Sequence, residues 1–273
     1  MNTPHPFDIA LQLAPADPAT AGRWTGRTQP DWGNMVGSFG GITAAQLLHA
    51  ACIDPRRLGE PLALTVNYAG AVADGAFEID AQPARTNRST QHWSITLTQG
   101  GQVCTTASAV FAVRRPTWSS AELRMPEVPP ADQVAAETRR PPVAWPQRYE
   151  FRFVEGGWPD YRNPRELPES RTVLWVRDQP PRPLDVQALA AICDVFYPRS
   201  FRRRQRFTPA GTVSITTYFH AEAAALAAQG DRALLAVATG RRFTQGFFDQ
   251  TAELWSHDGH LLASSHQVVY YKE

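Results

Sequence analysis

The chain has 273 residues and 43% of them are hydrophobic, enough for a sizeable core in two domains or in one large domain. Its formal net charge is only +1, so no overall field favours nucleic acid or an anionic membrane surface, and we expect neither as a partner. No apolar run approaches the roughly 18 residues that span a bilayer.

Two further features indicate the cellular compartment. Residues 1–13 have neither the basic start nor the continuous apolar segment of a secretory signal. Three cysteines lie far apart without a C-x-x-C pair, which argues against a disulfide framework and a zinc site; they are Cys52, Cys104 and Cys193. We therefore expect a cytoplasmic protein that binds no metal.

The first half of the chain predicts one buried helix followed by an antiparallel meander. Residues 38–52 are apolar on nearly every side of a helix, with Ser38 as the expected N-cap. Alternating apolar residues between turn residues predict strands at 62–68, 76–83, 91–99 and 103–114. A buried helix with such a meander is an α+β unit.

Seven prolines fall within residues 116–146, a density that predicts an extended linker packed on the surface. We therefore expect an N-terminal domain over residues 1–115, a linker over residues 116–147 and a C-terminal domain over residues 148–273.

The second half repeats the plan of the first. Pro183 and Leu184 are expected to open a helix, with Asp185 as its cap or first-turn acid, and an apolar stripe continues at helical spacing to Tyr197. Strands are predicted at 149–154, 172–176, 213–219, 234–238, 247–255 and 261–271.

Residues 101–114 align without a gap on residues 259–272, because each segment is a turn glycine, a long strand and a terminal base. Such self-similarity indicates two like domains rather than a solenoid. At one aligned position the first copy has Ala109 and the second has Gln267. One half of a pseudo-symmetric pair has therefore gained a polar side chain. That position is a candidate for chemistry.

A sheet that wraps around one apolar helix is the hotdog arrangement. Two such units in one chain predict an α+β double hotdog, with two antiparallel sheets that each wrap around a central helix. We expect the sheets to join edge to edge as an intramolecular pseudo-dimer, since that pairing removes exposed strand edges.

Three residues of the second half are candidates for catalysis, although each also has an ordinary structural interpretation. Asp194 lies on the flank of the apolar helical stripe, where a carboxylate must be solvated, paired or functional. Thr212 begins a strand, and threonine is a common strand former. Gln267 lies within the last strand beside apolar neighbours, although glutamine is common on a solvated sheet face.

One basic run stands out in an otherwise balanced chain. It consists of Arg199, Arg202, Arg203, Arg204 and Arg206. Its simplest interpretation is a solvated loop after the helix. The functional alternative is a patch that meets a phosphorylated ligand.

Four segments together resemble the acyl-CoA thioesterase II family of double-hotdog proteins. They are residues 39–46, 191–194, 211–220 and 259–267. The most specific parts are the Gly-Thr-Val-…-Tyr-Phe-His register of the third segment and the Leu-Leu-Ala-Ser-Ser-x-Gln ending of the fourth. One strand departs from the family, because Ser214 and Ile215 stand where bacterial members often carry Asp-His.

The resemblance implies an active site. The catalytic Asp, Thr (or Ser) and Gln of family members map by motif onto Asp194, Thr212 and Gln267. It implies hydrolysis of a small-molecule acyl-CoA thioester by a water that the Asp deprotonates and the other two orient, with no cofactor besides the CoA of the substrate. Gly40 and Gly41 at a helix N-terminus are candidate contacts for the thioester oxygen or the substrate.

The same resemblance bears on CoA binding and on symmetry. Arg202, Arg203 and Arg204 are candidate contacts for the CoA phosphates. Since the first helix has no carboxylate and Ala109 replaces Gln267, we expect one site per chain, built mainly from the second half. Double-hotdog proteins often associate further, so a homo-oligomer is open.

Two alternatives to a thioesterase remain. A non-catalytic acyl-binding protein would use the same three residues only to satisfy one another's hydrogen bonds. An enoyl-CoA hydratase of the hotdog type would carry an Asp-x-x-x-x-His motif, and no aspartate of this chain is followed by histidine at that spacing.

Overall fold

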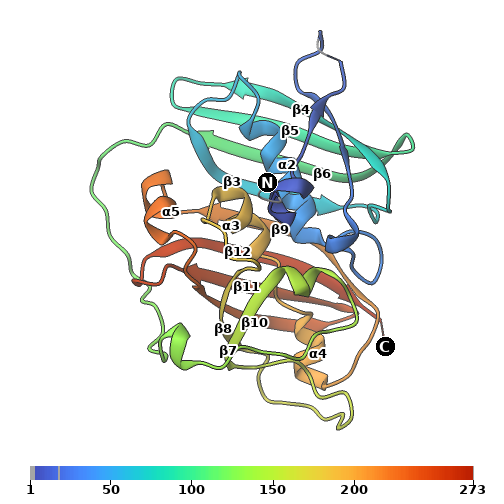
Figure 1. The fold of residues 1–273 in the computed structure, drawn as a ribbon, viewed down its shortest axis with the longest axis vertical. Helices are drawn as coiled ribbons and strands as arrows, with labels where there is room; N and C mark the ends of the chain where they lie inside the picture. Colours follow the sequence, from blue (N-terminus) through green and yellow to red (C-terminus); the bar gives the residue numbers. More distant parts are fainter. Residues whose placement is uncertain (1–3, 18, 273) are drawn as a thin grey trace.

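The computed structural model describes residues 4–17 and 19–272 of the chain (Figure 1). The first half forms α1 (Pro6–Ala10), β1 (Ala14–Pro15), β2 (Arg23–Arg27), η1 (Pro30–Trp32), α2 (Gly40–Cys52), β3 (Glu60–Tyr68), β4 (Ala76–Thr86), β5 (Thr90–Gln99) and β6 (Gln102–Ala112). The predicted helix and the four predicted strands are confirmed, with ends shifted by a few residues. Ser38 was wrongly expected as the cap: the N-cap is Phe39, and Ser38 forms a β-bridge with Gly33.

The second half forms η2 (Ala131–Gln133), η3 (Trp145–Arg148), β7 (Tyr149–Glu155), β8 (Thr172–Asp178), α3 (Val186–Ile192), α4 (Arg199–Arg204), β9 (Ala210–Phe219), α5 (Ala223–Gln229), β10 (Leu234–Thr244), β11 (Phe247–Trp255) and β12 (Leu261–Tyr271). The predicted spans of β11 and β12 agree residue for residue. The Asp185 cap is confirmed, because its Oδ1 accepts a 2.8 Å bond from the Ala188 N–H. Among the helices of the described residues, none is long and apolar enough to cross a membrane.

The strands of the described residues form one continuous antiparallel sheet rather than two. Their order is β1-β2-β4-β5-β6-β3-β9-β12-β11-β10-β8-β7, with the first half at the top of Figure 1 and the second half below it. The halves join where β3 pairs with β9, and Thr65 and Thr216 lie opposite each other with their hydroxyl oxygens 3.0 Å apart. The predicted edge-to-edge pairing is therefore confirmed, and it merges the two sheets.

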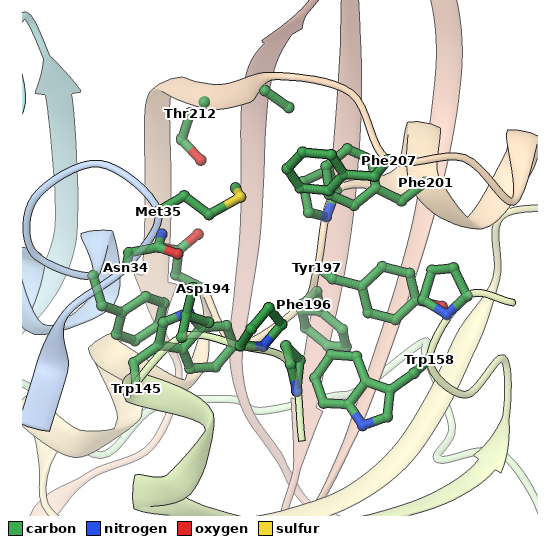
Figure 2. Close-up of a pocket in the computed structure, with 18 of the residues that line it drawn as sticks. Asn34, Met35, Trp145, Trp158, Asp194, Phe196, Tyr197, Phe201, Phe207 and Thr212 are labelled. Carbon is green, nitrogen blue, oxygen red and sulfur yellow. The ribbon is translucent and has the colours of Figure 1, made fainter. Parts of the chain in front are cut away.

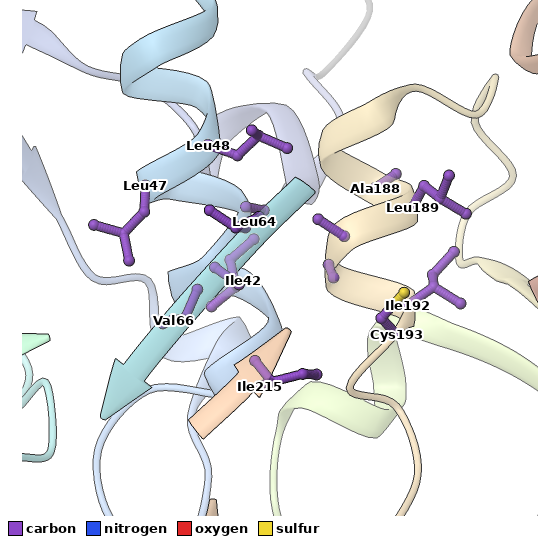
Figure 3. Packing of buried hydrophobic residues seen from close by; sticks show 14 of the residues in the cluster. Ile42, Leu47, Leu48, Leu64, Val66, Ala188, Leu189, Ile192, Cys193 and Ile215 are labelled. Atoms are coloured by element: carbon purple, nitrogen blue, oxygen red, sulfur yellow. The ribbon is translucent and has the colours of Figure 1, made fainter. Parts of the chain in front are cut away.

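The core lies between the concave sheet and two helices that pack side by side (Figure 3). Ile42, Leu47 and Leu48 of α2 and Leu189 of α3 are each at most 1% exposed, so the helices are buried on more than one face. The hydrophobic effect therefore anchors both helices within the curve of the sheet. This is the predicted double hotdog.

Helix α3 ends five residues earlier than its apolar stripe predicts. The N–H groups of Asp194 and Val195 bond to carbonyls three residues back instead of four, which tightens and ends the helix after Ile192. Pro198 further disfavours a helical conformation at Tyr197. Asp194 therefore lies just beyond the helix and not on its flank.

The proline-rich segment is only partly a surface linker. Met125, Val128 and Val134 pack against a small apolar cluster on the outer side of the second-half strands, and Trp175 Nε1 donates to the Pro129 carbonyl at 2.9 Å. The end of the segment turns inward, because Trp145 is buried and stacks on Phe39 with ring centroids 4.3 Å apart. The division into domains at residues 115 and 148 stays a prediction.

The arginine run is not a solvated loop, so that interpretation is wrong. Its residues 199–204 form α4, and Arg199 is fully buried. The Arg199 guanidinium donates to Ser170 O at 3.0 Å and to Thr172 Oγ1 at 2.7 Å, and it stacks over the Tyr197 ring. Burial lowers its pKa to about 10.

Candidate functional site

A cavity of about 970 Å³ brings together the three residues that the sequence singles out (Figure 2). Asp194, Thr212 and Gln267 all line it. Figure 2 shows Asp194 and Thr212 on one side of the cavity, with Met35 beside them. Much of the remaining wall is aromatic, including Phe39, Trp145, Trp158, Phe196, Tyr197 and Phe207. The cavity thus combines a small polar face with a large apolar one, as sites for small molecules commonly do.

Asp194 lies at the junction of the two halves. Its carboxylate contacts the N-terminus of α2, where the Gly41 N–H bonds to it. A Cβ at Gly40 would lie 2.7 Å from Asp194 Oδ2, so a side chain there would displace the carboxylate from its present position. The Tyr68 hydroxyl donates to the Gly40 carbonyl at 2.8 Å and holds the start of the helix.

Burial dominates the electrostatics of Asp194. The side chain lies in a desolvated position that raises its pKa to about 7, and the bond from the Gly41 N–H opposes this shift only in part. No salt bridge within residues 4–17 and 19–272 involves this carboxylate. A carboxylate that changes charge near neutral pH suits acid–base chemistry.

Thr212 and Gln267 form a hydrogen-bonded pair across neighbouring strands. Thr212 lies on β9 and its Oγ1 donates to Gln267 Oε1 on β12 at 3.2 Å. Gln267 is 4% exposed, so the expected solvated sheet face does not describe it. The bond fixes the Gln267 oxygen toward Thr212, which leaves the amide nitrogen as the group available to a ligand.

The cavity also contains polar residues that sequence reasoning missed. Gln250 on β11 pairs directly opposite Gln267 and is 1% exposed, although its alternating strand pattern predicts an ordinary polar position. Arg139 and Arg140 of the linker line the cavity, whereas Arg202 does not. The other two predicted phosphate contacts, Arg203 and Arg204, are absent from its wall as well.

Two of the predicted phosphate arginines lie in other surroundings. Arg203 pairs with Glu166 at 2.8 Å, and its guanidinium also donates to the Pro168 carbonyl. Arg204 borders a separate small pocket together with Thr208. Contact between these arginines and CoA stays a prediction.

The first half contains counterparts of the site residues that are paired or replaced, and it is called the closed half below. Asp54 follows α2 at the same spacing as Asp194 follows α3, since each lies two residues after the last residue of its helix. Its carboxylate forms a 2.7 Å salt bridge with Arg56, and the resulting hydrogen bonds hold its pKa below the ordinary value despite burial. Trp93 occupies the strand position that corresponds to Gln250, beside Ala109. The closed half therefore has a paired carboxylate and an indole where the second half has an unpaired carboxylate and an amide.

The sequence matches known protein families over most of its length. Residues 28–112 match the acyl-CoA thioesterase N-terminal domain, and residues 123–271 match the acyl-CoA thioesterase C-terminal domain. Among curated proteins, none matches the sequence.

Solved structures share the whole fold. A conserved protein of unknown function with a hot dog fold from Alicyclobacillus acidocaldarius is 46% identical over 99% of each chain, with a TM-score of 0.93. An acyl-CoA thioesterase II from Mycobacterium marinum is 19% identical, with 97% of this chain and 98% of that chain covered and a TM-score of 0.73. The tesB protein of Mycobacterium avium subspecies paratuberculosis is 17% identical, with 98% of each chain covered and a TM-score of 0.77.

Proposed function

Because the chain belongs to the acyl-CoA thioesterase family, we propose that it hydrolyses acyl-CoA thioesters to the free acid and CoA, with Asp194 as the general base. One observation carries the proposal: a buried carboxylate with a pKa of about 7 shares a cavity with the Thr212–Gln267 pair. A base is most effective when its pKa lies near the working pH.

The proposed reaction uses one water and no covalent intermediate. Asp194 accepts a proton from the water while the water oxygen attacks the thioester carbonyl carbon and the carbonyl electron pair moves to oxygen. Collapse of the tetrahedral adduct breaks the C–S bond, and the leaving thiolate takes the proton from Asp194. Thr212 and Gln267 orient the water, which removes part of the entropic barrier. These steps need no cofactor besides the CoA of the substrate.

We propose that the acyl group lies against the aromatic wall of the cavity, where apolar burial supplies the binding energy. Arg139 and Arg140 line the same cavity, so they are better placed than Arg202 to meet the CoA phosphates.

The test is release of free thiol from short, medium, long and aromatic acyl-CoAs. Turnover of any member supports hydrolysis, and the ranking across the panel identifies the acyl class. A folded chain that binds acyl-CoA, as measured by calorimetry, but releases no thiol would instead be an acyl-binding protein. In that case Asp194, Thr212 and Gln267 would have a structural role and no catalytic one.

The activity should depend on pH through Asp194. Only the ionised carboxylate accepts a proton, and burial raises its pKa to about 7. We therefore expect kcat/KM to rise between about pH 6 and 8 and to level off above, whereas an ordinary aspartate would be fully ionised by about pH 5. A profile that stays flat from pH 5 to about 9 would contradict the role of Asp194 as the base.

A further inference from the structure

Gln250 carries a buried hydrogen-bond donor that has no partner. Its side chain is 1% exposed and lines the cavity, and its Nε2 bonds to no atom of residues 4–17 and 19–272. Leaving a buried amide nitrogen unpaired costs stability, because the group gives up its bonds to water. Because Gln250 also lines the cavity, a ligand bound there can supply the missing acceptor.

The neighbours of Gln250 in the sheet explain why its donor is free. On one side β10 places Gly240 directly opposite, which has no side chain to offer. On the other side β12 places Gln267 directly opposite, and its Oε1 already accepts the bond from Thr212. Residues in register on adjacent strands point to the same face, so the two amides lie together on the cavity wall.

The closed half of the molecule shows the contrast. There β5 places Trp93 opposite Ala109, as β11 places Gln250 opposite Gln267. The closed half fills this pair of positions with an indole and a methyl group. The half with the cavity has two amides at these positions. Since the other half folds with apolar residues there, folding does not require the amides.

We propose that Gln250 Nε2 donates a hydrogen bond to the thioester carbonyl oxygen and stabilises the negative charge that this oxygen gains during attack. This role rests on the proposed hydrolysis. The Gly41 N–H bonds to the Asp194 carboxylate, so an expected backbone donor is already engaged and a side-chain donor supplements it. A donor aimed at a developing charge lowers the barrier without strengthening ground-state binding.

Two matched variants test this inference. Gln250→Met keeps the length of the side chain and removes the donor, so we expect kcat and kcat/KM to fall by roughly 10² to 10³-fold with little change in KM. Because no internal bond is lost, Tm should stay the same or rise. Gln91→Met removes a buried amide that bonds Leu58 N, Arg56 O and Trp93 Nε1, so its Tm should fall while kcat is retained.

Ligand binding separates a catalytic role from a structural one. An acyl-CoA thioether lacks the carbonyl and should bind the wild type and Gln250→Met equally. The trifluoromethyl ketone analogue, whose hydrate resembles the tetrahedral adduct, should bind the variant at least 10-fold more weakly. If Gln250→Met keeps the wild-type kcat, the assignment is overturned while hydrolysis stands. The same holds if Gln250→Met loses activity and Tm together, because the residue would then support the fold. A wild type that hydrolyses no thioester overturns the proposed function as well.

Discussion

Asp194→Asn is expected to lower thiol release by roughly 10²-fold or more. Asparagine has the same shape and can still accept the bond from the Gly41 N–H, but its amide oxygen is far too weak a base to take a proton from water. The loss should appear in kcat and should not be recovered at any pH. Steady-state thiol release by both proteins between about pH 5 and 9 measures it.

The matched control is Asp54→Asn in the closed half. Asp54 occupies the equivalent position after α2 but forms a salt bridge with Arg56. Removing its charge breaks the pair between a buried carboxylate and an exposed guanidinium and should lower stability, whereas turnover per folded molecule should stay near that of the wild type. Equal loss of activity in both variants would mean that the aspartates support the fold and not the reaction.

Stability gives a second measure of Asp194, and its sign follows from linkage. An aspartate with a folded pKa of about 7 and an ordinary unfolded pKa binds more protons in the native state between those values. The free energy of unfolding therefore falls as pH rises through this window. Asp194→Asn carries no such penalty, so it should be more stable than the wild type at pH 8. The buried Asp178 also has a pKa raised to about 7, but it contributes equally to both proteins, so its effect cancels in the comparison.

Trp93→Ala is expected to lower the free energy of unfolding by about 3–5 kcal/mol. The indole is 1% exposed, its ring packs against Phe111 with centroids 6.1 Å apart, and its Nε1 donates to Gln91 Oε1 at 2.9 Å. Removing it opens a void in the closed half that the strands on either side hold open. Urea denaturation followed by circular dichroism measures the loss.

Trp118→Ala is the control for the loss of a tryptophan, because this side chain is 87% exposed and should change stability by less than about 0.5 kcal/mol. Turnover of folded Trp93→Ala should be retained, since Trp93 does not line the cavity that contains Asp194. A loss below about 1 kcal/mol would show that the closed half is loosely packed and not filled by the indole.

Local patterns determined most of the secondary structure. Strands β11 and β12 alternate apolar and polar residues between clear turn signals, and their predicted spans agree with the structure. Helix α2 was predictable because its largely apolar segment runs for 13 residues, which is longer than a typical buried strand. The duplication, read from two aligned strands, predicted the edge-to-edge pairing that joins the halves at β3 and β9. Such signals depend on neighbours along the chain.

The site depended on contacts that no linear pattern contains. Gln250 and an exposed strand glutamine have the same local sequence signal, and only the register with Gly240 and Gln267 shows that its donor is buried and unpaired. Asp54 and Asp194 follow their helices at equal spacing, yet Arg56 neutralises the first and burial raises the pKa of the second. The sequence by itself determined most of the elements, because periodicity and turns act locally, and its duplication indicated that two like halves join edge to edge. Tertiary structure decided which carboxylate and which amide face a cavity, because burial and cross-strand register are set by residues far away in the chain. The Asp54–Arg56 pair is a local exception, since its residues lie two positions apart.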